Sequence, residues 1–81
     1  MVKLPRISGN KLIKVLTNTM GYEIVRQKGS HIRLSKNTEN GIHNITIPNH
    51  EELAKGTLNS ILSSVSKWNN ISKDKLIEMI K

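Results

Sequence analysis

Helical spacing of apolar residues dominates the start of the chain. Leu12, Ile13, Leu16 and Met20 recur at intervals of three and four positions, which is the pattern of an amphipathic helix. Ser8 is a good N-cap, and Gly21 is a typical stop signal. Pro5 disfavours helix in the lead-in before it. The sequence therefore predicts a first helix over residues 9–20.

From residue 22 the pattern changes to that of strands. Residues 22–28 contain Tyr, Ile and Val, and Gly29-Ser30 fits the two central positions of a tight hairpin turn. In residues 31–35 apolar and polar residues alternate, so Ile32 and Leu34 should face a core while His31, Arg33 and Ser35 face solvent. Residues 37–41 are predicted as a polar loop. Residues 43–48 form a third strand that Pro48 ends.

The last third of the chain returns to helical spacing. Residues 49–56 are predicted as a loop, and Thr57 is expected to cap a second helix that Asn69-Asn70 ends. Ser72 is expected to cap a short final helix over residues 73–80. The predicted inward positions of the two helices are Leu58, Ile61, Leu62, Val65 and Trp68, then Leu76, Ile77 and Ile80.

The element order is α-β-β-β-α with an additional short C-terminal helix. This order predicts an α+β fold in which a three-stranded antiparallel sheet carries its helices on one face and leaves the other face open. The double-stranded-RNA-binding domain has the same order. With 81 residues, we expect residues 1–81 to form a single domain with one modest core.

Composition excludes several classes of protein. The chain has no cysteine, so disulfides and thiolate metal sites do not contribute. Its unbroken apolar runs are two residues long, which excludes a membrane-spanning helix, and the N-terminus lacks the apolar segment of a secretory signal. We therefore expect a soluble cytoplasmic protein that does not bind membranes.

Positive charge is concentrated in the first half. Residues 1–36 contain eight of the 13 Lys and Arg residues and a single acidic residue, Glu23, whereas residues 37–81 contain five basic and five acidic residues. The whole excess of +7 therefore lies in residues 1–36. Such asymmetry is typical of a surface that binds a polyanion. A cationic face that serves solubility is the alternative.

The stretch from Arg26 to Arg33 carries the candidate chemistry. It places His31 beside the predicted turn, among Arg26, Lys28 and Arg33. Cleavage of RNA without a metal needs a base for the ribose 2′-OH, an acid for the leaving 5′-oxygen and cations for the developing phosphate charge. Histidine, with an ordinary pKa of about 6.5, suits either proton transfer. An ordinary surface histidine is the competing interpretation.

The other candidate chemistries lack parts. His43 alternates with Ile45 and Ile47 and is expected to face the helices with a hydrogen bond at the edge of the core. His50 is expected in a loop, where a stabilising hydrogen bond is favoured over a second proton-transfer role. The spacing of the three histidines is no metal-ligand motif, so neither a metal nor another cofactor is predicted. With one Tyr, one Trp and no Phe, recognition of RNA shape and backbone is favoured over base stacking.

Several motifs together resemble the HicA toxin family. They are Gly21-Tyr22, Val25-Arg26-Gln27-Lys28-Gly29-Ser30-His31, Ile47-Pro48-Asn49-His50, and Leu53-Ala54-Lys55-Gly56-Thr57-Leu58-Asn59-Ser60-Ile61-Leu62. They occur in the family's order and near its usual spacing, from about Leu4 to the last helix.

The resemblance implies the toxin of a type II toxin–antitoxin pair with a fold like the double-stranded-RNA-binding domain. It implies a ribonuclease (an mRNA interferase) that acts on messenger RNA and is neutralised by a HicB-type antitoxin that binds it and covers the site. The family's catalytic histidine corresponds to His31. Together with the charge pattern, this predicts RNA contacts from Arg26, Lys28, Gly29, Ser30 and Arg33.

This chain departs from the family pattern at Ile32, where many members have a second histidine or an aromatic residue, so a paired-histidine mechanism is not expected there. The segment from Ser63 to Asn70 is also unusual. Two other functions remain open at this point: a non-catalytic RNA-binding module, and a basic subunit whose cationic face meets an acidic protein.

Overall fold

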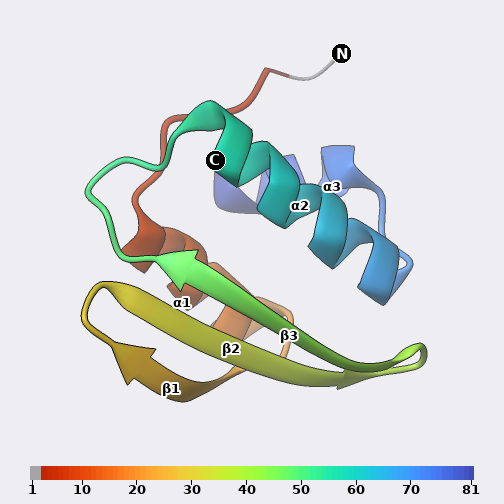
Figure 1. Ribbon diagram of the computed structural model, residues 1–81. Helices are drawn as coiled ribbons and strands as arrows, with labels where there is room; N and C mark the ends of the chain where they lie inside the picture. The colour runs from red at the N-terminus through yellow and green to blue at the C-terminus, as the bar shows by residue number, and fades with distance from the viewer. Residues whose placement is uncertain (1–2) are drawn as a thin grey trace.

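The computed structural model of the chain describes residues 3–81. Its elements follow the predicted order, as Figure 1 shows. They are α1 (Gly9–Thr19), β1 (Glu23–Lys28), β2 (His31–Thr38), β3 (Gly41–Pro48), α2 (Lys55–Asn69) and α3 (Lys73–Ile80). None of these helices is long and apolar enough to cross a lipid bilayer.

The three strands form one antiparallel sheet in the order β1-β2-β3. β2 and β3 pair without interruption from His31–Pro48 to Thr38–Gly41. The pairing of β1 with β2 is interrupted by a bulge between Ile24 and Arg26, after which Arg26 lies opposite Arg33. The central strand β2 is therefore held on both sides, and β1 and β3 are the edges.

All three helices lie on one side of the sheet (Figure 1), and the core forms between the two layers. The strands contribute Ile32, Leu34 and Ile47 to this core, and all three are less than a tenth exposed. The predicted α+β architecture, with one covered and one open sheet face, is confirmed, and it is consistent with a fold like the double-stranded-RNA-binding domain. The helical core residues are Leu12, Ile13, Leu16, Leu58, Ile61, Leu62, Val65, Leu76, Ile77 and Ile80.

The caps of α1 and α3 are those that the sequence predicts, but the start of α2 is not. The Ser8 and Ser72 side chains accept hydrogen bonds from the N–H groups of Lys11 and Lys75. The predicted cap Thr57 was wrong, because α2 begins at Lys55 after Ala54, which makes no side-chain cap. The backbone N–H of buried Leu53 bonds to the Ile7 carbonyl at 2.9 Å, and this contact fixes the chain just before the helix.

The strands β2 and β3 are longer than predicted. The expected polar loop over residues 37–41 shrinks to the turn Glu39-Asn40. The Thr38 hydroxyl stabilises this turn by donating to the Gly41 carbonyl at 2.7 Å and accepting from the Asn40 N–H at 3.1 Å. Because these hydrogen bonds hold the turn together, the polar residues next to it continue the two strands instead of forming a loop.

A polar cluster is buried at the end of the sheet that is far from the Gly29-Ser30 turn. His43 lies at the centre of this cluster and is 3% exposed. Its Nδ1 lies 2.6 Å from the Tyr22 hydroxyl and its Nε2 lies 2.9 Å from the Ser64 hydroxyl. The Trp68 ring, which is only partly buried, stacks on the His43 ring with centroids 5.1 Å apart. The prediction that His43 faces the helices and is hydrogen-bonded is confirmed, whereas Trp68 covers this histidine rather than filling the apolar core.

The hydrogen bonds of this cluster have a defined direction. The Asn69 amide donates to the Tyr22 oxygen at 2.9 Å, so the Tyr22 hydroxyl donates onward to His43 Nδ1. His43 is then the neutral tautomer that carries its proton on Nε2 and donates to Ser64. The Lys36 ammonium donates to the Asn69 carbonyl oxygen at the start of the chain of hydrogen bonds. The cluster is thus fully hydrogen-bonded with His43 uncharged.

Candidate functional site

His31 lies on the open face of the sheet at one end. It is the first residue of β2, directly after the Gly29-Ser30 turn. Its neighbour Ile32 is buried in the core, so alternation along the strand directs the His31 side chain to the opposite, exposed side. The imidazole is therefore accessible to a large ligand.

The strand register gathers the three predicted cations around His31. Lys28 pairs with His31, and Arg26 pairs with Arg33 in a neighbouring row of the sheet. Residues opposite each other in a ladder share a face, so all four side chains belong to the open face. Arg26 and Lys28 share this face by the simple alternation of the strand, and the bulge between Ile24 and Arg26 shifts the register only of the residues before Arg26.

These cations have no acidic partners. The only ion pair found within residues 3–81 joins Lys81 to Glu78 at the C-terminal end. Arg26, Lys28 and Arg33 are all exposed. Neighbouring unpaired cations repel one another, and an anion placed among them relieves that repulsion. The arrangement favours the binding of a phosphate group beside His31. We call the end of the open face formed by Arg26, Lys28, His31 and Arg33 the basic end.

The turn that holds His31 depends on a glycine. Gly29 has a φ of +59°, the left-handed conformation that two-residue hairpin turns require at a central position. A β-carbon on Gly29 would meet no atom within 4 Å, so only the backbone conformation favours glycine here. Gly29 and Ser30 are both exposed, and their backbone lies at the border of the basic end.

Two backbone contacts that the sequence did not predict support this turn. The N–H of Asn49 donates to the Ser30 carbonyl at 2.6 Å, and the N–H of Gly9 donates to the His50 carbonyl at 2.9 Å. The loop after β3 thus links the turn to the first residue of α1. A β-carbon on Gly9 would lie 1.9 Å from the Pro48 carbonyl oxygen, so only glycine allows this approach. The motif Pro48-Asn49-His50 was the only sequence signal for these contacts.

The remaining histidines lie apart from this chemistry. His50 is exposed in the loop after β3, as predicted, and its backbone carbonyl accepts the hydrogen bond from Gly9. Burial lowers the pKa of His43 below its ordinary value, which favours the neutral ring. Nowhere in residues 3–81 do three or more His, Asp or Glu side chains gather as ligands of a metal would.

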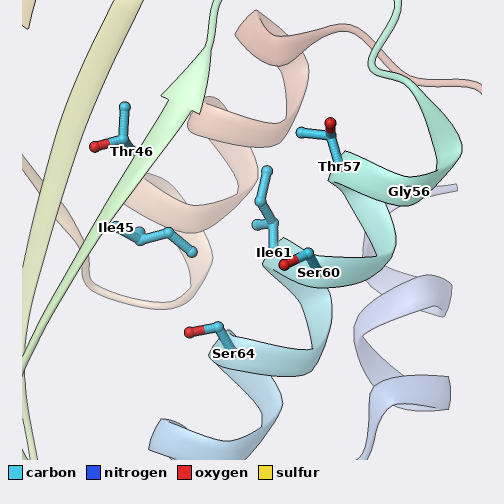
Figure 2. Close-up of a pocket in the computed structure, with 7 residues that line it drawn as sticks. All are labelled: Ile45, Thr46, Gly56, Thr57, Ser60, Ile61 and Ser64. Atoms are coloured by element: carbon cyan, nitrogen blue, oxygen red, sulfur yellow. The ribbon is translucent and has the colours of Figure 1, made fainter.

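The other end of the open face is less charged and partly apolar. Val25 and Ile42 are 55% and 64% exposed and border a shallow hollow together with Glu23, Ser35 and Asn37. A second groove runs between β3 and α2, as Figure 2 shows, and does not include His31. The four residues of the basic end are all exposed on the open face of the sheet, and such a surface suits a polymer more than a small molecule.

Comparison with known proteins identifies the family. No curated protein and no solved structure was found to match this chain. The family model described as the HicA toxin of bacterial toxin–antitoxin systems matches residues 9–65, which is more than half of the chain. This match spans the turn, the three cations, His31 and the Gly9 and Asn49 contacts. The chain belongs to the HicA toxin family of bacterial toxin–antitoxin systems.

Proposed function

We propose that this toxin is a metal-independent endoribonuclease that cleaves mRNA and that His31 is its catalytic residue. The observation that carries the proposal is the exposed His31 beside three unpaired cations on one open surface. Family membership supports the same activity. Because messenger RNA is the substrate, we infer that the protein works in the cytoplasm.

The chemistry proceeds by attack of the ribose 2′-OH on the adjacent phosphorus. The 2′-oxygen loses its proton as the new P–O bond forms, and the 5′-oxygen gains a proton as its bond to phosphorus breaks. His31 performs one of these proton transfers. Lys28 and Arg33, together with Arg26, hold the phosphate and stabilise its developing negative charge. The products are a 2′,3′-cyclic phosphate and a free 5′-hydroxyl.

Backbone recognition explains the surrounding residues. The exposed Gly29 and Ser30 allow the RNA backbone to approach His31 closely, because neither carries a large side chain. No Phe, Tyr or Trp side chain belongs to the basic end, so binding rests on phosphate contacts and shape. We further propose a HicB-type antitoxin as the protein that neutralises this site by covering it.

Purified wild-type protein and two matched variants test the proposal. With EDTA present, wild type is expected to cleave mRNA and leave 5′-hydroxyl ends, while His31→Ala leaves the RNA intact. His50→Ala, which changes an exposed histidine in a nearby loop, is the control and should cleave like wild type. Circular dichroism and thermal melting establish that all three proteins are folded. Equal cleavage by wild type and His31→Ala would overturn the assignment, as would 5′-phosphate ends or loss of activity in EDTA.

A non-catalytic RNA-binding function is the second candidate, favoured by the exposure of the three cations. It predicts that wild type and His31→Ala bind RNA equally and leave it intact. Cell growth after induction of each protein is a second measurement. Growth arrest by wild type alone supports the nuclease, and equal arrest by both proteins supports toxicity through RNA binding.

A further inference from the structure

The two edges of the sheet differ in how they are protected against another strand. β1 is interrupted by the bulge after Ile24 and carries the charged residues Glu23, Arg26 and Lys28. Bulges and charged side chains are the usual means by which proteins prevent pairing at a sheet edge. β3 has neither: its eight residues contain no charged side chain, and its pairing with β2 is uninterrupted.

The outer side of β3 presents a regular row of backbone groups. Pairs in an antiparallel ladder alternate between those that exchange hydrogen bonds and those that do not. The two-residue turn makes Thr38–Gly41 an exchanging pair, so Ile42, Asn44 and Thr46 direct their N–H and C=O groups outward. Pro48 also lies at a non-exchanging position, where its lack of an N–H group removes no hydrogen bond to β2. Within residues 3–81, no backbone hydrogen bond joins these three outward positions to another segment.

A groove runs along this edge. It is bordered by Ile45 and Thr46 of β3 and by residues of the first three turns of α2. Figure 2 shows Ile45 directed from the strand toward the helix and the Ser60 and Ser64 side chains directed from the helix toward the strand. Hydroxyls of this kind can donate to or accept from an incoming backbone. Helix α2 therefore borders the edge without closing it.

We propose that the antitoxin adds a β-strand to the outer edge of β3, lying in the groove beside α2. Outward N–H and C=O groups at three alternate positions supply main-chain hydrogen bonds, as in other cases of strand addition. The toxin–antitoxin family to which the chain belongs supplies the partner, and the inference concerns how that partner is held.

This position brings the partner to the catalytic face. Strands in a sheet lie about 4.8 Å apart, so an added strand would be about 10 Å from β2. Thr46 and Pro48 share rows of the sheet with Arg33 and His31. Side chains of the added strand that project to the open face would therefore border the basic end. Acidic residues at those positions would neutralise the cations and exclude RNA.

Charge favours the antitoxin over a second copy of this chain. Each copy has a net charge of +7, so two copies repel, whereas an acidic strand is attracted. Because β3 carries no charged side chain, it does not repel a partner strand of either charge. A partner with an acidic, extended segment thus fits both the edge and the surface beside it.

Amide hydrogen exchange on the wild-type toxin tests the inference directly. The probe is the purified HicB-type antitoxin proposed above, mixed with ¹⁵N-labelled toxin and no RNA. In the free toxin the outward amides of Ile42, Asn44 and Thr46 should exchange quickly. In the complex their exchange should slow by roughly 100-fold, as expected for newly paired backbone. Unchanged exchange at all three amides in a saturated complex would overturn the proposal.

A matched pair of variants gives the second test. Asn44→Pro removes one outward N–H without removing a hydrogen bond to β2, while Asn44→Thr keeps that N–H. A lost backbone hydrogen bond with an unpaired acceptor costs about 1–3 kcal/mol, so Asn44→Pro should weaken antitoxin binding by roughly tenfold to 100-fold. Asn44→Thr should bind like wild type. Equal affinities for the two variants, each folded by circular dichroism, would contradict strand addition.

These results are independent of the ribonuclease proposal, because neither measurement contains RNA. Cleavage without amide protection would leave the nuclease standing and remove the β3 docking site. Amide protection without cleavage would support the β3 docking site and remove the nuclease proposal. Protection that grows with toxin concentration in the absence of antitoxin would assign the edge to a second copy and overturn the proposal.

Discussion

Gly9 and Pro48 approach each other so closely that a β-carbon on Gly9 would lie 1.9 Å from the Pro48 carbonyl oxygen. This contact joins the first turn of α1 to the last residue of β3. It lies beside the Asn49–Ser30 hydrogen bond that supports the hairpin turn of His31. The geometry of the basic end therefore depends on a glycine 22 positions before His31 in the sequence.

Gly9→Ala should destabilise the fold, because the backbone of Pro48 must move to admit the new methyl group. Overpacking of this kind costs about 1–3 kcal/mol. Gly56→Ala is the matched control: Gly56 is also helical, but a β-carbon there would meet no atom within 4 Å, so the variant should be neutral or gain up to about 1 kcal/mol. Urea unfolding measures both. Equal stabilities would show that Pro48 yields without cost.

Stability should fall on acidification because of His43. Burial lowers the pKa of His43 in the folded protein below the value of about 6.5 that it has when unfolded. The unfolded chain then binds the proton more readily, so this contribution to stability is complete above about pH 6.5 and is lost as pH falls below it.

Thermal melting at pH 7.5 and pH 5.5 checks this expectation. The melting temperature of wild type should decrease between the two values, and His43→Gln should show a smaller decrease although it is less stable at both. His50→Gln, at an exposed position, should keep the wild-type dependence. The same decrease in His43→Gln as in wild type would assign the acid sensitivity to other groups.

Tyr22→Phe should destabilise the protein by about 1–3 kcal/mol, because it leaves His43 Nδ1 without a partner and removes one of the two hydrogen bonds that the Asn69 NH₂ group donates. Asn69→Ala should also destabilise it. The two losses should not add, since both variants interrupt the same hydrogen-bond chain, and a coupling energy of about 0.5–3 kcal/mol is expected. A double-mutant cycle by urea unfolding measures it. Simple additivity would mean that the two residues act independently.

RNA binding should depend on salt through the cations of the basic end. In a His31→Ala background that prevents cleavage, Arg33→Ala should lower affinity and reduce the slope of log affinity against log salt by about 0.7 for a single-stranded RNA. Lys75→Ala, on α3 in the helical layer, is the control and should leave the slope unchanged. Fluorescence anisotropy over a salt series measures both. Equal slopes would place the RNA elsewhere.

Patterns within one element could be predicted from the sequence. The helical spacing of Leu12 and Leu16, the serine caps and the Gly29-Ser30 turn each rest on residues close together in the chain. The cations and His31 also lie within eight positions, so the predicted turn was sufficient to group them. The structure confirms the sheet and its covered face for this reason.

Features that depend on distant residues could not be predicted in this way. The bulge that places Ile24 opposite Leu34 and Glu23 opposite Ser35 is a matter of register, and periodicity does not predict register. The stacking of Trp68 on His43 joins residues 25 positions apart, and an apolar helix pattern simply assigns Trp68 to the core. The early start of α2 follows from the Leu53–Ile7 contact, which no capping signal records.

The Asn49–Ser30 hydrogen bond also determines when the basic end can reach its final geometry during synthesis. An isolated two-stranded hairpin is at best marginally stable in water, so residues 23–38 cannot hold the basic end by themselves. The site acquires its geometry only after β3 and Asn49 have left the ribosome and paired with β2. A nascent chain that ends before Asn49 therefore carries every proposed catalytic and RNA-binding residue but lacks the contact that supports their turn.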